Sequence, residues 1–298
     1  MPDVVQYDQK FLENPPRINE LRRFLRVFLN RPLVVFGVLV ILLLFICAAF
    51  PQWIAPYDPV KQDLRSVLLQ PSSEHLLGTD GLGRDLFSRI IYGARTAVIV
   101  GIIALGIAAV IGMVLGLTAG YFGGITFTII MRFIDALMAF PPFILALTIA
   151  ALLGSGVKMV IIALGVGMMP GYARVMCGQS LSIRENDYIL AAKSLGASNR
   201  RIMFRHLLPN AFPPMIVLMT MMIGMTILAE AGLSFLGIGI KEPTIAWGSL
   251  VNDGYKYLLT HPLLSTGPGV AIILVVFAFN MVGDGIRDAI DPRLRGLL

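Results

Sequence analysis

Few residues of this chain are of a type and spacing that could carry chemistry, and the most suggestive are acids beside apolar stretches. Glu230 and Asp284 lie nearest to membrane depth, together with Asp135 at the inner end of a predicted span. An acid inside a membrane typically marks the path of a solute or a proton, so Glu230 is a candidate pathway residue. The alternative, which we favour for Glu230 and Asp284, is an interfacial acid that pairs with a nearby base.

Motifs of the common enzyme classes are missing from the sequence. No Gly-Lys-Ser/Thr phosphate loop is present, so the chain itself does not bind ATP in that mode. There is no His-Glu-x-x-His, and His75, His206 and His261 lie far apart. Cys47 and Cys177 fall in or beside apolar stretches, which indicates buried small side chains rather than a disulfide or a metal pair. The sequence predicts no catalytic, cofactor-binding or metal-binding residue, and no enzyme.

The composition of the chain predicts which kind of structural element carries these acidic candidate residues. Of the 298 residues, 56% are hydrophobic and 14% are charged, against about 25% charged in soluble domains. The mean hydropathy is +0.79. These values predict an all-α polytopic membrane protein. The net charge of +6 is explained by charged cytoplasmic loops rather than by nucleic-acid binding.

Uncharged apolar stretches predict six membrane-spanning helices. The first, Leu33–Phe50, has 18 residues, enough to cross a hydrocarbon core of about 30 Å. A cleaved signal peptide is the alternative, but the preceding polar segment is too long, so we predict an uncleaved anchor. The next charge-free stretch, the 36 residues 96–131, is too long for one span, and the turn at residues 121–124 divides it. The other spans are predicted at residues 125–153, 159–176, 211–237 and around 270–281.

Three glycines of the second span indicate close helix packing. Gly112, Gly116 and Gly120 recur at every fourth position on one helical face. Small residues at this spacing let two helix backbones approach each other in a membrane. The alternative is a chance pattern in a glycine-rich chain.

Prolines predict breaks in two spans. Pro141-Pro142 are expected to kink the third span, and Pro170-Gly171 to interrupt the fourth. Broken helices are tolerated in a bilayer where neighbours or a water-lined cavity satisfy the freed backbone groups. Pro141, Pro142 and Pro170 are therefore pathway candidates, with purely structural kinks as the alternative.

A polar island at residues 184–209 separates two apolar stretches and is far longer than a connection between spans requires. Asp187 can cap a first short helix. Gly196 is a natural stop because glycine adopts the left-handed C-cap conformation freely. Ser198 can cap a second helix that is predicted to end at Pro209. Two short helices joined by a glycine favour a docking element over the alternative, a solvated loop with charged faces.

Basic residues predict the orientation in the membrane. Six spans place both termini on one side together with the polar island, and 16 of the 24 lysines and arginines lie on that side. Short cytoplasmic loops are rich in basic residues, so we predict that the termini and the island are cytoplasmic. Arg84, Arg89 and Arg95, in the loop before the second span, argue mildly the other way.

Several motifs together resemble a known family. Within the island, Leu190-Ala191-Ala192-Lys193-Ser194-Leu195-Gly196 is similar to the Glu-Ala-Ala-x-x-x-Gly loop of ABC importer permeases, with Leu190 in place of the glutamate. Other matching motifs are LLGTDGLGRDLFSRIIYGAR (76–95), EAGLSFLGIGI (230–240), PTIAWG (243–248) and GDGIRDAIDPRLR (283–295). From about Arg22 to the C-terminus, the chain resembles the C-type second permease of the dipeptide/oligopeptide/nickel group.

This resemblance implies a type I ABC importer permease fold that forms half of a translocation pathway. The implied partners are a second homologous permease, two ATPase subunits that hold ATP and Mg²⁺, an extracytoplasmic substrate-binding protein and the lipid bilayer. The implied location is the inner membrane of a prokaryote. The island would be a coupling helix whose contacts to the ATPase come from Leu190, Ala191, Ala192, Lys193, Ser194, Leu195, Gly196 and Arg200.

The sequence and the resemblance together predict three regions of the chain and a class of cargo. Residues 1–31 form a cytoplasmic segment with a basic amphipathic helix, residues 32–95 the first span and an extracytoplasmic loop, and residues 96–298 a five-helix core with the coupling loop 184–209. The expected cargo is di- or oligopeptides, with nickel, glutathione or oligosaccharide as alternatives. A stand-alone secondary transporter is disfavoured, because the sequence shows no series of intramembrane ionisable groups and no internal repeat. A structural membrane subunit is disfavoured by the prolines that are expected to break the third and fourth spans.

Overall fold

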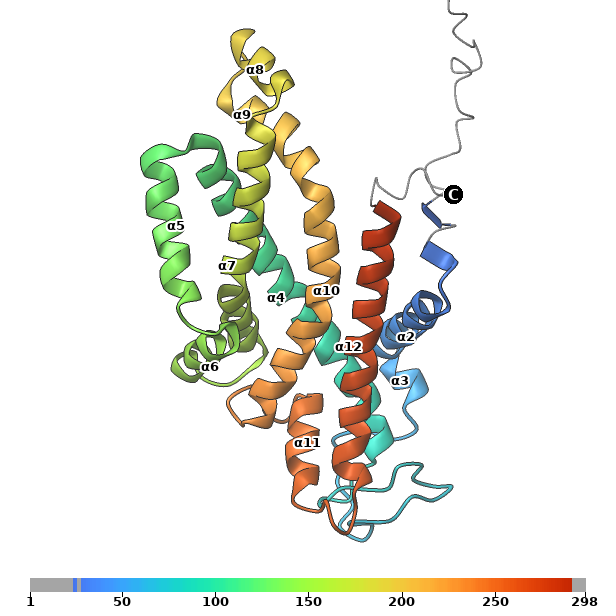
Figure 1. The fold of residues 1–298 in the computed structure, drawn as a ribbon. Helices are drawn as coiled ribbons and strands as arrows, with labels where there is room; N and C mark the ends of the chain where they lie inside the picture. The colour runs from blue at the N-terminus through green and yellow to red at the C-terminus, as the bar shows by residue number, and fades with distance from the viewer. Residues whose placement is uncertain (1–23, 26–27, 291–298) are drawn as a thin grey trace, which may run out of the picture.

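The computed structural model describes residues 24–25 and 28–290, and in this part of the chain the protein consists of helices and loops with one isolated β-bridge, between Thr79 and Asp85 (Figure 1). This confirms the all-α class. The predicted N-terminal amphipathic helix lies largely outside these residues. The α-helices are α2 (Pro32–Ala49), α3 (Pro51–Ile54), α4 (Leu86–Phe122), α5 (Gly124–Met138), α6 (Pro142–Leu153), α7 (Val157–Arg184), α8 (Asp187–Ser194), α9 (Asn199–Ile202), α10 (Leu208–Phe235), α11 (Trp247–Tyr255) and α12 (Leu263–Ile290); a π-helical turn, Met203–Leu207, joins α9 to α10.

Five helical segments of the described chain are long and apolar enough to cross a membrane: α2, α4, α7, the continuous segment Asn199–Phe235, and α12. Helices α5 and α6 meet at 85° and supply a sixth span when the bent pair is counted as one. The bend lies where the sequence predicts a kink, because Pro141 is the N-cap of α6 and Pro142 is its first residue. The six predicted spans therefore correspond to these elements.

Helix α4 starts earlier than the predicted second span, at Leu86, and continues through that span without a break. The Asp85 carboxylate caps its first turn by accepting hydrogen bonds from the Ser88 amide (2.8 Å) and hydroxyl (2.7 Å). Its 37 residues give a length of about 55 Å, well beyond the hydrocarbon core. Helix α4 therefore reaches from the end of the molecule that carries α8 and α9 (the α8 end) toward the end that carries α11 (the α11 end) (Figure 1).

Helices α4 and α7 make a backbone-to-backbone contact along the glycine stripe. Gly112 lies against Tyr172, Gly116 against Ala173, and Gly120 against Ser180. A Cβ atom added at Gly112 would lie 2.6 Å from the Cβ of Tyr172, closer than real Cβ contacts. Three glycines at four-residue spacing thus place one face of α4 directly on α7, as small-residue stripes do in membranes.

Helix α7 runs unbroken from Val157 to Arg184, so the predicted interruption at Pro170-Gly171 is wrong. Pro170 has no amide hydrogen to donate to the carbonyl of Val166. However, Ala173 and Met176, on the next turn, are fully buried against the rest of the core. Ala163 and Leu164, before the proline, are fully buried as well, so packing on both sides holds the helix together despite the missing donor.

The two limits of the described chain lie toward the same end of the molecule. Helix α12 runs from the α11 end toward the α8 end (Figure 1). Near its last turns, the Asp288 carboxylate is 2.5 Å from the guanidinium of Arg31, at the start of α2. The start of α2 and the end of α12 are therefore on the side of the polar island.

Candidate functional site

The polar island folds into two short helices whose relative direction is fixed by a glycine turn. Gly196 has a φ of +77°. Its amide donates to the carbonyl of Lys193 (2.9 Å), and the amide of Ala197 donates to the carbonyl of Ala192 (3.0 Å), which is a Schellman C-cap. The Ser198 hydroxyl accepts from the Arg201 amide (3.4 Å) and caps α9. Both caps lie where the sequence places them.

Two details of the island differ from the prediction. Asn186, not Asp187, occupies the N-cap position, and Asp187 is the first helical residue, where its charge favours the positive helix end. The second helix does not end at Pro209, because the π-helical turn Met203–Leu207 leads directly into α10. The π turn lies just before Pro209, which has no amide hydrogen to donate to a regular helical bond. The island is therefore continuous with α7 at one end and α10 at the other.

Side chains at the end of α4 bind the island to the spans. The Tyr121 hydroxyl donates to Oδ1 of Asn199 (2.7 Å), and the ammonium of Lys193 lies 5.6 Å from the centre of the Tyr121 ring. The Arg184 guanidinium donates to the carbonyl of Gly120 (3.1 Å). A cation is favoured at this position because α4 ends there with unsatisfied carbonyls. Three contacts thus fix the island to α4.

The island is anchored on one face and exposed on the other. Ile189 and Ile202 are fully buried, whereas Tyr188, Leu190 and Leu195 are 44%, 49% and 88% exposed. Large apolar side chains on the open face of a polar segment indicate a site for a protein partner. Of the residues predicted at the ATPase interface, Ala192 is half-buried and the others are exposed: Leu190, Ala191, Lys193, Ser194, Leu195, Gly196 and Arg200.

A four-residue charge cluster, formed by Asp80, Arg84, Arg89 and Glu242, lies at the α11 end and was missed by the sequence reasoning. Nε of Arg84 is 2.8 Å and Nη1 of Arg89 is 3.2 Å from Oδ2 of Asp80. Both guanidinium groups also bind Oε1 of Glu242, at 2.5 Å from Arg84 and 2.8 Å from Arg89. The two arginines are buried, and their charges are balanced by the two acids, so they do not argue against the predicted orientation. Glu242 follows Arg89 by 153 residues, and nothing in the sequence links them.

The Glu242 carboxyl titrates below its ordinary pKa of 4.5. Burial raises its pKa, but the hydrogen bonds from Arg89 and Arg84 outweigh that effect and lower it. Because the pKa is lower in the folded than in the unfolded protein, the carboxylate contributes stability above 4.5, and this contribution is lost as the pH falls through the folded-state pKa.

We expect Glu242→Gln to lower the thermal midpoint in detergent at neutral pH, because it removes a counter-charge of two buried arginines. Since Glu242 itself is half exposed and therefore partly screened by solvent, the loss in the free energy of unfolding should be only about 1–3 kcal/mol. The gap between variant and wild type should shrink below pH 4.5. Glu185→Gln is the control, because Glu185 forms only a surface pair with Arg184 (3.0 Å), and such pairs contribute little. Equal midpoints for Glu242→Gln and wild type at neutral pH would contradict the assigned role of the cluster.

Glu230 is buried within α10 and does not pair with a base in the described part of the chain, contrary to the favoured expectation. Its Oε1 accepts a hydrogen bond from the Ser234 hydroxyl (2.7 Å), and the same hydroxyl accepts from the Ile240 amide (3.1 Å). Glu230 thereby helps to fix the turn after α10. Of the other acids, Asp135 pairs with Arg174, and Asp284 forms no ion pair or side-chain hydrogen bond among the described residues.

An apolar cavity of about 700 Å³ lies between α5, α6, α7 and α10. Pro142 and Pro170 line it, so the structure brings these two pathway candidates together, whereas Pro141 and Glu230 lie outside its lining. Four methionines also line the cavity, and their flexible side chains adapt to varied apolar shapes: Met138, Met168, Met222 and Met225. Among the described residues, no cluster of His, Cys, Asp or Glu could hold a metal ion.

Comparison with known proteins identifies the class of protein that the sequence motifs predict. A family model described as "Binding-protein-dependent transport system inner membrane component" matches residues 112–296, and one described as "N-terminal TM domain of oligopeptide transport permease C" matches residues 20–71. The "Glutathione transport system permease protein GsiD" of Pectobacterium atrosepticum is 41% identical over 275 residues, covering 92% of this chain and 91% of that protein. Its counterpart in Escherichia coli O6:K15:H31 is 41% identical over 274 residues, covering 92% and 90%.

Solved structures of the MetNI methionine ABC transporter share the fold. One inward-facing form matches with a TM-score of 0.56 and 19% identity, over 69% of this chain and 98% of that chain. A second form matches with a TM-score of 0.54 and 19% identity, over 68% and 97%. At this identity the likeness concerns the fold alone.

Fold and site thus define a membrane permease subunit with the type I ABC importer fold. The chain belongs to the family of binding-protein-dependent transport system inner membrane components, as its motifs predict. It is a multi-pass inner membrane protein and the permease subunit of an ATP-driven importer, not an enzyme. Importers of this class work with ATPase subunits and a substrate-binding protein.

Proposed function

We propose that residues 184–209 are the coupling loop of this importer and that the α8 end faces the cytoplasm. The observation that carries the proposal is an anchored helix with an open apolar face: Ile189 is buried beneath α8 while Leu190 and Leu195 stand exposed. A cleft on an ATPase subunit would cover these two leucines, and Lys193 and Arg200 would supply polar contacts at its rim. The excess of basic residues on this side supports the cytoplasmic orientation.

The contacts of the island explain how a push on α8 would reach the membrane. Helix α8 follows α7 after the turn at Glu185-Asn186, and α9 continues through Met203–Leu207 into α10. Tyr121 and Gly120 tie the island to the end of α4 through Asn199 and Arg184. A displacement of α8 would therefore tilt three spans together, the kind of rigid-body movement that alternating access requires.

Two further subunit classes complete the proposed machine. A second, homologous permease would face the apolar cavity between α5, α6, α7 and α10 and supply the other half of the pathway. Two ATPase subunits would bind ATP and Mg²⁺, one of them on α8. Phe140, exposed on the wall of the cavity, would then contact the second permease.

For the cargo, we propose a short peptide. The relatives at 41% identity are named for transport of glutathione, which is a tripeptide, and an oligopeptide permease model matches residues 20–71. The methionine-rich cavity wall supports a cargo class with variable side chains, because such surfaces repack around different shapes. Identification of the ligand carried by the cognate binding protein distinguishes a peptide from nickel or an oligosaccharide.

Site-directed cross-linking tests the orientation and the partner together. In a background with Cys47 and Cys177 replaced by alanine, Leu195→Cys is expected to form a cross-link to an ATPase subunit in native membranes. Leu259→Cys is the matched control: Leu259 is 99% exposed, comparable to Leu195 at 88%, and follows α11 at the opposite end of the molecule. It should not reach the ATPase. A cross-link from position 259 to the ATPase, or none from position 195 in a transport-competent complex, would overturn the proposal.

A further inference from the structure

The ion pair between Asp135 and Arg174 joins two segments that cross the membrane, because Asp135 belongs to α5 and Arg174 to α7. Half of each side chain is exposed. Charged groups within a span are costly where they face lipid, and they typically face a water-filled path or another part of the protein. The exposed side of this pair is therefore turned toward water or a partner rather than toward the bilayer.

The pair lies beside the apolar cavity between α5, α6, α7 and α10, on its α8 side. Helix α5 runs away from the α8 end (Figure 1) and passes Asp135 three residues before Met138, which lines the cavity. Helix α7 runs toward the α8 end and passes Arg174 three residues after Gly171, which also lines it. Three residues are about 4.5 Å along a helix. Since no residue of the cavity lining is charged, this pair presents the first charges beyond the cavity on that side of the described chain.

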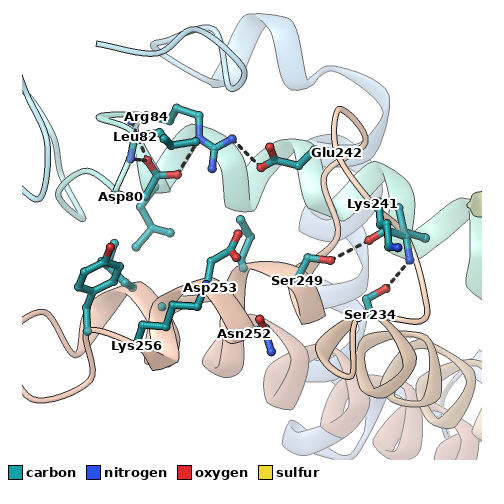
Figure 2. A pocket seen from close by; sticks show the side chains of 18 residues that line it. Asp80, Leu82, Arg84, Ser234, Lys241, Glu242, Ser249, Asn252, Asp253 and Lys256 are labelled. Atoms are coloured by element: carbon teal, nitrogen blue, oxygen red, sulfur yellow. Dashed lines mark hydrogen bonds and ion pairs between the residues drawn. The ribbon is translucent and has the colours of Figure 1, made fainter. Parts of the chain in front are cut away.

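A single contact holds the pair, so much of its bonding capacity is unused. Nη2 of Arg174 donates to Oδ1 of Asp135, and neither side chain forms another hydrogen bond or ion pair among the described residues. By contrast, Arg84 in the four-residue charge cluster lies between Asp80 and Glu242 and binds both (Figure 2). Oδ2 of Asp135 can still accept from a cation, and the remaining N–H groups of Arg174 can still donate to an anion.

Open space adjoins the pair on α7. Gly171 and Gly178 lie three residues before and four residues after Arg174, on the same helical face. No atom of another described element is within 4 Å of a Cβ added to either glycine. On α5, the exposed Arg132 lies one turn nearer the α8 end, on the face that carries the acid of the pair. Of the other walls, α6 contains no charged residue, and α10 contains only the buried Glu230.

We propose that this pair binds the charged termini of the peptide cargo as it leaves the cavity, with the ammonium group at Asp135 and the carboxylate at Arg174. The proposal rests on the peptide cargo proposed above. A peptide terminus in the apolar cavity loses its hydration without gaining a partner, and the pair restores one. An extended peptide advances about 3.5 Å per residue, so one or two residues bridge the step from the cavity lining to the pair while an apolar side chain still occupies the cavity.

The test measures uptake by the complete importer in proteoliposomes, with saturating binding protein loaded with trileucine, its C-terminal amide or its N-acetyl form. In wild type, blocking either terminus is expected to slow maximal uptake about tenfold. Arg174→Gln should slow the uptake of trileucine about tenfold but leave that of the amide unchanged, because the amide lacks the group that Arg174 binds. Asp135→Asn should show the same pattern toward the N-acetyl form. Asp284→Asn and Arg287→Gln, on the span α12, form no ion pair among the described residues and are the matched controls, which should keep the wild-type pattern.

Equal losses for free and blocked peptides in Arg174→Gln and Asp135→Asn would overturn the proposal, because a pair that only holds α5 on α7 cannot distinguish the termini. A wild-type importer that carries all three peptides equally fast would also overturn it, and would leave the proposed peptide cargo intact. Uptake of no peptide would reject the proposed cargo and this inference together. Should the neutral variants fail to assemble, Arg174→Lys decides. Its ammonium group cannot match the two oxygens of a carboxylate as a guanidinium does, so the advantage of trileucine over its amide should shrink, and an unchanged advantage rejects the proposal.

Discussion

Gly116→Leu is expected to abolish the folded permease. A Cβ atom at this position would overlap the carbonyl of Ala173 and lie 2.9 Å from both the amide nitrogen of Cys177 and the Cβ of Met176. Overpacking costs about 1–3 kcal/mol where side chains can shift, but here the obstacle is the backbone of a helix packed along its whole length. Since total stabilities are only about 5–15 kcal/mol, we expect the monodisperse yield after detergent extraction to fall below roughly a tenth of wild type.

Alanine substitutions give the matched comparison for this prediction. Gly106 lies on the same helix, and no atom of another described element is within 4 Å of the Cβ it would acquire. Gly106→Ala should therefore leave the thermal midpoint unchanged or raise it, because alanine is favoured over glycine in a helix by about 0.5–1 kcal/mol. Gly116→Ala should lower it. If both alanine variants melt alike, the contact between α4 and α7 does not determine the stability of the fold.

The spans and the glycine turn were predictable because their signals are local. Long charge-free stretches of this composition cross a membrane as helices, and glycines at four-residue spacing on one face favour close helix packing there. The Gly196 turn and the Ser198 cap depend on residues within five positions of each other. Each of these features can be read from a single window of sequence.

Features that depend on contacts between distant segments could not be predicted. The partners of Arg84 and Arg89 include Glu242, which lies in a different loop. Propensity alone places a helix end at Pro170 and at Pro209, but tertiary packing carries α7 through the first proline, and a π-helical turn precedes the second. Glu230 was expected at an interface, yet Ser234, one turn along the same helix, satisfies it in the interior. In each case the deciding neighbour is visible only in the folded chain.

These corrections strengthen the mechanical argument for the island. A second helix that ended at Pro209 would have left a flexible joint between the island and the fifth span. The observed continuity from α9 through Met203–Leu207 into α10 removes that joint. The Arg184 and Tyr121 contacts restrict the other side. At the α8 end, the exposed face of α8 is therefore the surface on which a partner could push.

Gly196→Trp is expected to disconnect ATP hydrolysis from transport without preventing membrane insertion. No atom of another described element lies within 4 Å of the Cβ that the substitution adds, so the indole would project outward from the corner between α8 and α9. The positive φ costs a non-glycine residue about 1–2 kcal/mol, which the fold tolerates. We expect uptake to fall about ten- to hundredfold, measured in proteoliposomes at equal permease content.

Gly196→Asn separates the effect of bulk from that of backbone strain. Asparagine enters the left-handed region more readily than other side chains and is much smaller than tryptophan, so this variant should retain most of the uptake. The two variants share the same backbone demand, and the difference between them reports the space available at the partner surface. Wild-type uptake by Gly196→Trp with the ATPase still bound would contradict a tight contact at this corner, because a partner seated on Leu195 and Gly196 leaves no room for an indole.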